Sequence, residues 1–237
     1  MKKFPPNPQP QGSVKLPQQL ADVYNKQMEL LPKAIAAGES EDDSNGYDLS
    51  SFPELHSKQL EMRELALQHG ELILDVLKNA SDAQQRLVAS DALGYAKQDR
   101  AQIEELVLAC HDPNGVVRNN ATRALAVLAS AHTKTSLEIP AEPFIEMLSS
   151  ESWTDRNKAE FLLEGITARR NPKVLAELRS EALEPLIEMA KWHASGHATV
   201  YRIILGRIGG IDELGLQKME EKSDQVDAIV AAARNAR

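Results

Sequence analysis

Apolar residues recur at helical spacing in four successive segments of the chain. The segments are counted from Arg86, Arg118, Arg156 and Ala198, and in each the third, sixth, seventh and tenth residues on are apolar. Spacings of three and four place side chains on one stripe of a helix. The pattern therefore predicts four amphipathic helices, each of which buries the same face.

A second apolar pattern precedes each of these helices. It occupies residues 72–77, 103–108, 144–148 and 186–190, so we expect four units of two helices in series. One such unit cannot bury its apolar face alone, whereas stacked units share a continuous core. Sustained alternation of the kind that strands require is absent from the sequence. The predicted fold class is all-α.

One segment carries a family resemblance. Residues 112–128 resemble the second half of a HEAT repeat, and the resemblance extends more weakly over residues 71–210, where Ala80, Ser150 and Trp192 replace the aspartate of the motif. It implies a right-handed α-solenoid of about four two-helix HEAT-like repeats, which presents an extended surface to other macromolecules. The family's D-x-x-x-x-[VI]-R-x-x-A-x-x-A-L run is matched at Asp112, Val117, Arg118, Ala121, Ala124 and Leu125.

The first fifty residues lack the repeat pattern. Five of the twelve prolines lie in residues 1–17, which we expect to form an extended or disordered Pro/Gln-rich arm. Residues 18–50 are predicted to form a short amphipathic helix from Gln18 to Ile35, followed by an acidic, solvated linker. Residues 51–237 are predicted to form the HEAT-like repeat domain.

Composition narrows the function classes. The formal charge of −8 disfavours nucleic-acid binding through bulk charge. No apolar run approaches the ~20 residues of a membrane span. The single cysteine, Cys110, fits a reducing compartment. Residues 1–3 are charged like the start of a signal peptide, but prolines follow in place of an apolar region. The chain as written is therefore expected to be cytoplasmic, or exported if a signal peptide has been removed.

The sequence holds no convergent catalytic set. His193 and His197 have metal-ligand spacing, but a turn sequence lies between them and no glutamate or cysteine ligand accompanies them. Cys110 and His111 are adjacent, and adjacent residues on a helix diverge by about 100°. The glycines of residues 206–210 suit a helix C-terminus better than a phosphate loop. We therefore expect no enzyme activity, no metal and no cofactor.

Three arginines occupy the same repeat position and allow two interpretations. A column of guanidinium groups can bind phosphate or carboxylate. In HEAT-like repeats, however, the equivalent arginine commonly bonds the aspartate six residues earlier and nearby turn carbonyls. The resemblance thus favours a structural ladder, in which loss of Arg118 would leave Asp112 unpaired at a cost of about 1–3 kcal/mol. The ladder residues are Arg86, Asp112, Arg118 and Arg156.

The second helix of each repeat lines the concave side of HEAT-like stacks, so its surface is the candidate partner site. Phe161 and Ile203 are candidate apolar anchors. Alternatively, both pack against the C-terminal helices around Leu214 and Val226. The candidate concave-face residues are Asn119, Arg123, Asn157, Phe161, Arg202 and Ile203.

The sequence favours a non-enzymatic protein–protein interaction scaffold or adaptor that binds a protein or peptide on its concave face. A second hypothesis is a HEAT-like DNA-binding protein of the DNA-repair glycosylase type, which requires a positively charged groove. Asp91 and Glu160 interrupt such a groove. A third is a phycobilin-lyase-like repeat protein, although no pigment-handling motif is present. The pattern does not indicate an oligomeric state.

Overall fold

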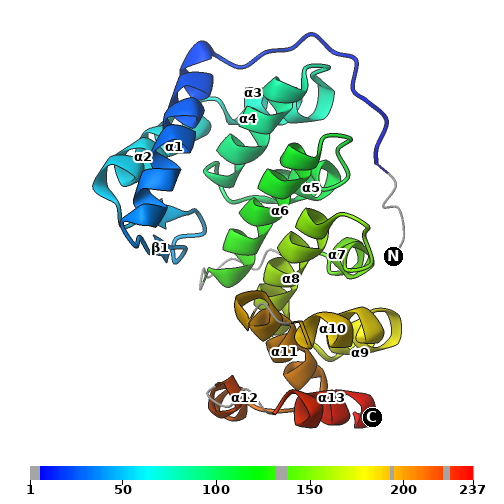
Figure 1. Ribbon diagram of the computed structural model, residues 1–237. Coiled ribbons are helices and arrows are strands. Elements are labelled where there is room, and N and C mark those ends of the chain that lie inside the picture. Colours follow the sequence, from blue (N-terminus) through cyan, green and yellow to red (C-terminus); the bar gives the residue numbers. More distant parts are fainter. Residues whose placement is uncertain (1–5, 132–137, 193–194, 221–224, 237) are drawn as a thin grey trace. The chain divides into compact units, whose positions relative to one another are not determined.

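The structure is a computed structural model that describes residues 6–131, 138–192, 195–220 and 225–236. The chain divides into an N-terminal unit, residues 5–139, and a C-terminal unit, residues 140–237. Each unit consists mainly of helices (Figure 1). The predicted all-α class is confirmed.

In the N-terminal unit, consecutive helices form stacked pairs. Helix α3 packs against α4, α5 packs against α6, and the second helices α4 and α6 pack against each other (Figure 1). Helix α1 packs against α2 and α4. The elements are α1 (Gln18–Ala36), β1 (Glu41–Asp42), β2 (Leu49–Ser50), α2 (Pro53–Gln68), α3 (Gly70–Asn79), α4 (Ala83–Gly94), α5 (Arg100–Ala109) and α6 (Gly115–Ser130).

The C-terminal unit continues the pattern of paired helices. Helix α7 packs against α8, α10 packs against α11, and the second helices α8 and α11 are in contact. Helix α13 covers another part of α11. The elements are α7 (Glu142–Met147), α8 (Trp153–Thr167), α9 (Pro172–Glu181), α10 (Leu183–Ala190), α11 (Ser195–Ile208), α12 (Glu213–Glu220) and α13 (Val226–Asn235).

Two repeats contain three helices where the sequence predicted two. His69 alone joins α2 to α3, and Ala182 joins α9 to α10 in the same way.

The second helices begin at equivalent positions. Asp82, Asn114 and Ser152 lie four residues before Arg86, Arg118 and Arg156, and each side chain accepts a hydrogen bond from a backbone N–H of the first turn. Such N-caps satisfy amide groups that have no partner within the helix. The caps therefore fix the start of each second helix and with it the register of the apolar face.

The predicted apolar stripe forms the core of each unit. The first residue of the stripe is fully buried in three repeats, where it is alanine, and almost fully buried as Tyr201 in the fourth. Small residues let helices approach closely: a Cβ atom added at Gly94 of α4 would lie 3.1 Å from the Cβ of Ala124 on α6. The alanines are Ala89, Ala121 and Ala159.

Residues 6–16 are extended and lie along the ends of α3 and α5 (Figure 1). The N–H of Gly12 donates to the carbonyl of Asn79 (2.7 Å), and the N–H of Asn7 donates to the carbonyl of His111 (2.6 Å). Asn79 and His111 each precede the repeat arginine by seven residues. The arm therefore binds the same carbonyl in two consecutive repeats.

The acidic segment after α1 forms a hairpin. Strands β1 and β2 pair antiparallel, with Glu41 opposite Ser50 and Asp42 opposite Leu49. We call residues 39–50 the strap. The sequence had indicated a solvated linker because its acidic and small residues show no apolar face; the structure instead places Leu49 and Ser50 in buried positions.

Candidate functional site

The three column arginines make the same contact with the backbone. In each, Nη1 donates a hydrogen bond to the carbonyl six residues earlier, at the turn between the first and second helix of the repeat. This contact secures the turn to the second helix. The pairs are Arg86 with Ala80, Arg118 with Asp112, and Arg156 with Ser150.

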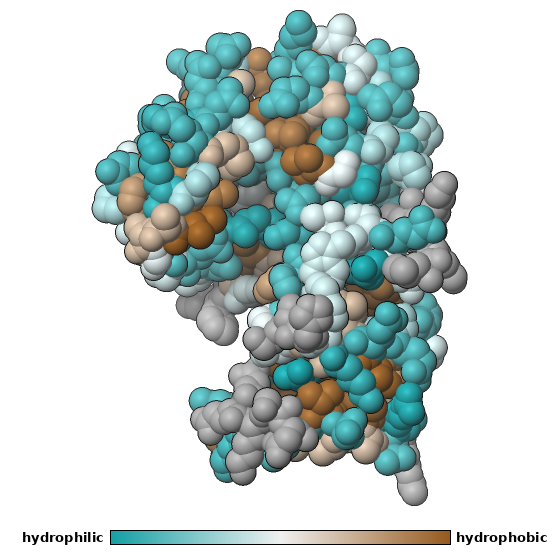
Figure 2. All heavy atoms as spheres, viewed as in Figure 1, coloured by the Kyte–Doolittle hydropathy of each residue, from teal (hydrophilic) through white to brown (hydrophobic). Residues whose placement is uncertain are grey.

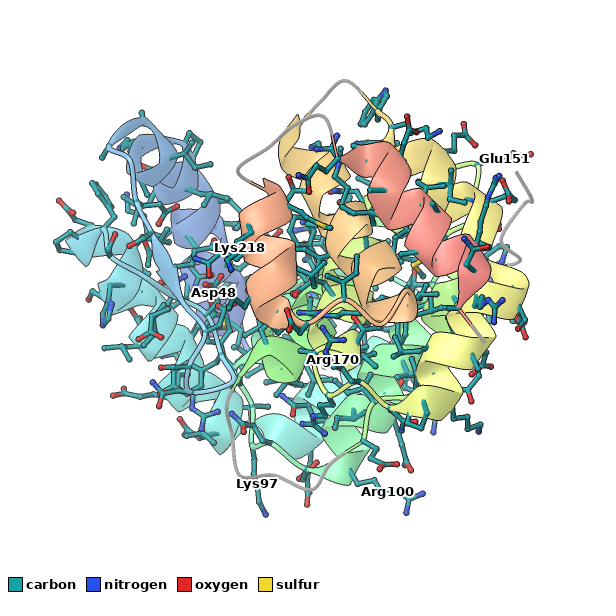
Figure 3. The ribbon with its side chains drawn as sticks, turned by 90° about the horizontal axis from the view of Figure 1, so that it is seen from below. Asp48, Lys97, Arg100, Glu151, Arg170 and Lys218 are labelled. Atoms are coloured by element: carbon teal, nitrogen blue, oxygen red, sulfur yellow. The ribbon has the colours of Figure 1, made fainter. Side chains whose placement is uncertain are left out.

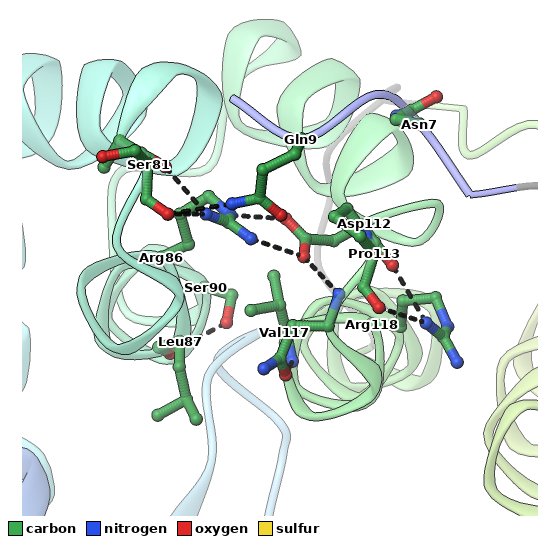
Figure 4. A network of polar contacts seen from close by, with 12 residues as sticks. Asn7, Gln9, Ser81, Arg86, Leu87, Ser90, Asp112, Pro113, Val117 and Arg118 are labelled. Atoms are coloured by element: carbon green, nitrogen blue, oxygen red, sulfur yellow. Dashed lines mark hydrogen bonds and ion pairs between the residues drawn. The ribbon is translucent and has the colours of Figure 1, made fainter. Parts of the chain in front are cut away.

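Asp112 joins two repeats. Its carboxylate accepts hydrogen bonds from Arg86 of the preceding repeat, at 2.7 Å from Nε and 3.0 Å from Nη2 (Figure 4). Both side chains are almost completely buried. The sequence-based expectation paired this carboxylate with Arg118, whereas Arg118 donates to the backbone carbonyls of Asp112 and Pro113. The N–H of Asn114 also binds Oδ1 of Asp112 (2.7 Å), which orients the carboxylate.

The second-helix surface of the N-terminal unit is covered in part by the strap. Arg123 of α6 contacts Oε1 of Glu41 and Oδ2 of Asp48, both at 2.5 Å. Asn119, one turn earlier on α6, is half-buried. Within this unit, the predicted partner-binding arginine thus binds two carboxylates of its own chain.

The strap is fixed at several points. The N–H of Ser50 donates to Oε1 of Gln59 on α2 (2.7 Å). Arg63 stacks over the ring of Tyr47, with its guanidinium carbon 4.5 Å from the ring centroid, and that ring lies 6.4 Å from the ring of Tyr95. Gln98 donates to the carbonyl of Asn45. These contacts hold the strap against α2 and α4.

In the C-terminal unit, a polar network connects the two second helices. The amide Nδ2 of Asn157 on α8 lies 2.8 Å from Oε1 of Glu160 and 2.8 Å from Nδ1 of His197 on α11. Glu160 is fully buried, and its Oε2 atom has no hydrogen-bond partner. Burial raises the pKa of Glu160 to about 8. Glu160 is therefore mostly protonated at neutral pH.

Three rings gather beside this network, and we call Trp153, Trp192 and His197 the aromatic cluster. The two indole rings lie 4.5 Å apart between centroids, and His197 meets Trp153 edge-on at 5.3 Å. Sequence reasoning missed the cluster because the tryptophans are 39 residues apart in chain order. Only the contact between α8 and α11 brings their turns together.

The other predicted surface residues of this unit have different environments. Phe161 on α8 is 41 % exposed and Leu214 on α12 is 60 % exposed, so neither side chain is buried by C-terminal helices. Ile203 is half-buried. Arg202 donates through Nε to the carbonyl of Ala190 (2.9 Å) at the end of α10. Of the candidate residues Phe161, Ile203 and Arg202, Phe161 is the one that presents a large apolar side chain to solvent.

Exposed apolar residues are distributed unevenly over the surface. Hydrophobic residues reach the surface in separate patches between hydrophilic ones, including a patch over α10 and α11 (Figure 2). Large apolar side chains exposed elsewhere include Ile35 of α1 and Leu108 of α5.

The residues considered in the sequence as metal ligands, as a nucleophile or as a phosphate loop have the following environments. His193 lies outside the described residues, and within the described ranges no group of three or more His, Cys, Asp or Glu side chains is arranged to hold a metal ion. Cys110 is buried, with Sγ 3.3 Å from Oγ1 of Thr122. Gly210, at φ +75°, ends α11 in the left-handed conformation. No described helix has both the length and the apolar character needed to cross a bilayer.

Comparison with known proteins identifies the fold. No protein-family model matches the sequence. No curated protein matches it either. Among solved structures, the designed armadillo repeat protein YIII(Dq)4CqI is similar over 78 % of this chain and 94 % of its own, with 18 % identity and a TM-score of 0.52.

Two further solved structures show comparable similarity. Computationally designed armadillo repeat proteins for modular peptide recognition match with 18 % identity and a TM-score of 0.51. A designed armadillo repeat protein in complex with the peptide (KR)4 matches with 16 % identity and a TM-score of 0.49. Both alignments cover 78 % of this chain and 94 % of the other. The protein therefore has a HEAT/armadillo-like helical repeat fold, as the resemblance of residues 112–128 had implied.

Proposed function

We propose that this protein is a non-enzymatic scaffold that binds an extended segment of a partner protein on the second-helix surface of its C-terminal unit. The observation that carries the proposal is the contact between Arg123 and the strap. It is an example, within the same chain, of a second helix that binds an extended segment through its outward side chains.

Arg123 and Phe161 occupy equivalent positions in consecutive repeats. Each lies five residues after the column arginine of its own second helix, Arg118 or Arg156. In the N-terminal unit this position holds carboxylates of the strap, whereas Phe161 keeps 41 % of its surface exposed. The proposed site is therefore the position at which Phe161 is open to a partner.

The chemistry of this surface suits a peptide that carries apolar or planar side chains. Phe161 provides an exposed ring on α8, and the aromatic cluster includes Trp153 of the same helix. Tryptophan and other aromatic residues dominate the binding energy of many protein interfaces. The fold also supports the proposal, because designed proteins for modular peptide recognition share it.

The nucleic-acid alternative has less support. Arg123, Lys158, Arg202 and Arg207 are the basic residues that would supply a positive groove. Three of them are engaged within the chain: Arg123 by the strap carboxylates, Arg202 by the carbonyl of Ala190, and Arg207 by Glu164 and Glu213. The phycobilin-lyase-like alternative stays a prediction.

A peptide-display screen tests the proposal. The immobilised full-length chain is expected to enrich a recurrent linear motif, and a synthetic peptide with that motif should bind about tenfold more weakly to a Phe161→Ala variant. Ile35→Ala is the matched control, since Ile35 is more exposed than Phe161 and lies on α1. An enriched motif that binds both variants equally, or no enrichment at all, would contradict the proposal.

A further inference from the structure

We propose that the strap is a pH-dependent cover over the second-helix surface of the N-terminal unit, held most firmly in mildly acidic solution and loosened above neutral pH. The inference concerns α4 and α6 and does not depend on the binding function proposed for the C-terminal unit. It starts from a group of carboxylates that converge on one cation.

The strap brings three acidic side chains to the second helices, where a fourth is already present. Glu41 and Asp48 contact Arg123 directly, and Asp43 lies close enough to both carboxylates for electrostatic repulsion to act on it. Asp91 of α4 lies with Asp48 and Arg123 around a single cavity of about 40 Å³. One guanidinium group cannot neutralise four carboxylates, so the fully ionised cluster carries excess negative charge.

Three oxygen atoms of this cluster are buried without a hydrogen-bond partner. They are Oδ1 of Asp43, Oδ1 of Asp48 and Oδ2 of Asp91. Burying an ionised carboxylate without a partner is costly, and the usual response is protonation. The cavity has room for about one water molecule. Among the described residues, the acidic groups do not form an arrangement that could hold a metal ion. Protons are therefore the means by which this cluster reduces its charge.

The groups around Asp91 supply little further positive charge. Tyr24 of α1 and Tyr95, directly after α4, are buried next to it. Arg63 of α2 stacks on the ring of Tyr47 and donates hydrogen bonds to the carbonyls of Tyr95 and Ala96. Lys97 and Arg100, in and after the loop that follows α4, point outward into solvent, unlike Asp48 (Figure 3). The remaining charged groups on the elements packed against α4 are exposed or half-buried: Asp22, Lys26, Glu29 and Lys33 of α1; Glu54, His56, Lys58, Glu61 and Glu64 of α2; Glu71, Asp75 and Lys78 of α3; Glu104 and Glu105 of α5; Arg118 of α6; and Glu39 and Asp42 of the strap.

The titration of the cluster agrees with this geometry. Burial raises the pKa of Asp91 to about 7, although Arg123 opposes the rise, and Asp48 adds to it. Burial, then Asp48 and Glu41, raise the pKa of Asp43 to about 6. When the strap is open, both carboxyls face water and return towards the usual value near 4.

The sign of the effect follows from linkage. The closed strap binds protons more tightly than the open one, so closure is favoured at low pH and loses free energy as the pH rises from about 4 to about 7. Arg123 of α6 contacts Glu41 and Asp48, and these ion pairs attach the strap to the second helix. Ionisation of Asp43 and Asp91 then adds repulsion without adding a cation.

Hydrogen exchange on the full-length protein tests the proposal. Protection factors, corrected for the intrinsic exchange rate, are measured for amides of the strap at about pH 5.5 and about pH 8. We expect protection to fall by about tenfold or more at the higher pH in the wild-type chain, and to change much less in Asp91→Asn. Glu64→Gln is the control, because Glu64 is exposed on α2 and should leave the wild-type behaviour intact.

A second variant separates loosening of the strap from general instability. Arg123→Gln removes the cation and is expected to leave the strap weakly protected at both pH values, while amides in α8 of the C-terminal unit keep their protection. Strap protection that is independent of pH in the wild type, or an unchanged pH response in Asp91→Asn, would overturn the proposal.

Discussion

Arg86 and Asp112 form a buried, bidentate ion pair that joins two consecutive repeats. Nε and Nη2 of Arg86 bind the two carboxylate oxygens of Asp112, and Nη1 of the same side chain holds the carbonyl of Ala80. One guanidinium group thus connects the turn of its own repeat to the turn of the next. The equivalent residues of the other repeats are alanine, serine and tryptophan, none of which has a carboxylate. Among these four positions, Asp112 is therefore the one that can form such an ion pair.

Replacing Arg86 with methionine is expected to destabilise the protein by about 3–5 kcal/mol, because it leaves the Asp112 carboxylate buried without its cation. Urea unfolding followed by circular dichroism measures the change. Arg100→Met is the control: Arg100 is exposed, its ion pair with Glu104 lies at the surface, and such pairs contribute about 0–1 kcal/mol. Equal losses in the two variants would show that the pair between the repeats is not a major source of stability.

Glu160→Gln is expected to remove part of the pH dependence of folding. The pKa of Glu160 is raised to about 8 by burial, so the folded state keeps a proton that the unfolded state releases above its ordinary value near 4.5. Stability therefore falls with rising pH between these values, at up to about 1.4 kcal/mol per pH unit, and the fall ends above about pH 8. Glutamine resembles the neutral acid and avoids this loss.

The measurement is the difference in unfolding free energy between Glu160→Gln and wild type across that range. We expect the variant to gain stability relative to wild type as the pH rises. Glu151→Gln serves as the control, since Glu151 is exposed in the turn before α8. A difference that stays constant with pH would mean that Glu160 is ionised in the folded protein.

Phe161→Ala is expected to cost less stability than Leu163→Ala. Phe161 is 41 % exposed, whereas Leu163, two residues later on α8, is fully buried. Truncating a buried leucine costs about 2–5 kcal/mol because it removes apolar contacts and leaves a cavity. Thermal unfolding of both variants provides the comparison. A loss for Phe161→Ala as large as that for Leu163→Ala would support the alternative in which Phe161 is part of the internal packing.

The repeat pattern predicted the main fold because the apolar stripe is the physical cause of the stacking. Ala89, Ala121 and Ala159 share a position in the sequence and are buried alike in the structure. The position of Asp112 in a HEAT-like motif identified it as a structural residue. Its partner was missed because the motif is read within one repeat, whereas the ion pair crosses to the preceding repeat.

The candidate site was less accessible to sequence reasoning. Local patterns place residues on a helix face, but they do not reveal which distant segment covers that face. The strap binds Arg123 from about 75 residues away, and the aromatic cluster forms only when the turns before α8 and α11 meet. Phe161, by contrast, is 41 % exposed on α8, and this exposure distinguishes it from Arg202, which donates to the carbonyl of Ala190.

Gly12→Ala is expected to detach the arm from the repeats. A Cβ atom at residue 12 would lie 2.6 Å from the carbonyl oxygen of Asn79, which is the atom that accepts the hydrogen bond from Gly12. The contacted atom belongs to the backbone and cannot rotate away as a flexible side chain could. The arm must therefore move, and the hydrogen bonds of Gly12 with Asn79 and Ser81 are lost. Because each such bond contributes about 0.5–1.5 kcal/mol, the whole protein should lose only a small part of its stability.

Hydrogen exchange at Asn7 and Gly12 measures the release. Both amides donate to turn carbonyls in the wild type, and both are expected to exchange faster in Gly12→Ala, because only four residues separate them. Ser13→Ala is the control, because Ser13 is exposed next to the same position. If Asn7 stayed protected while Gly12 exchanged freely, the two carbonyls would bind the arm independently, and the contact with His111 would be sufficient to hold its first residues.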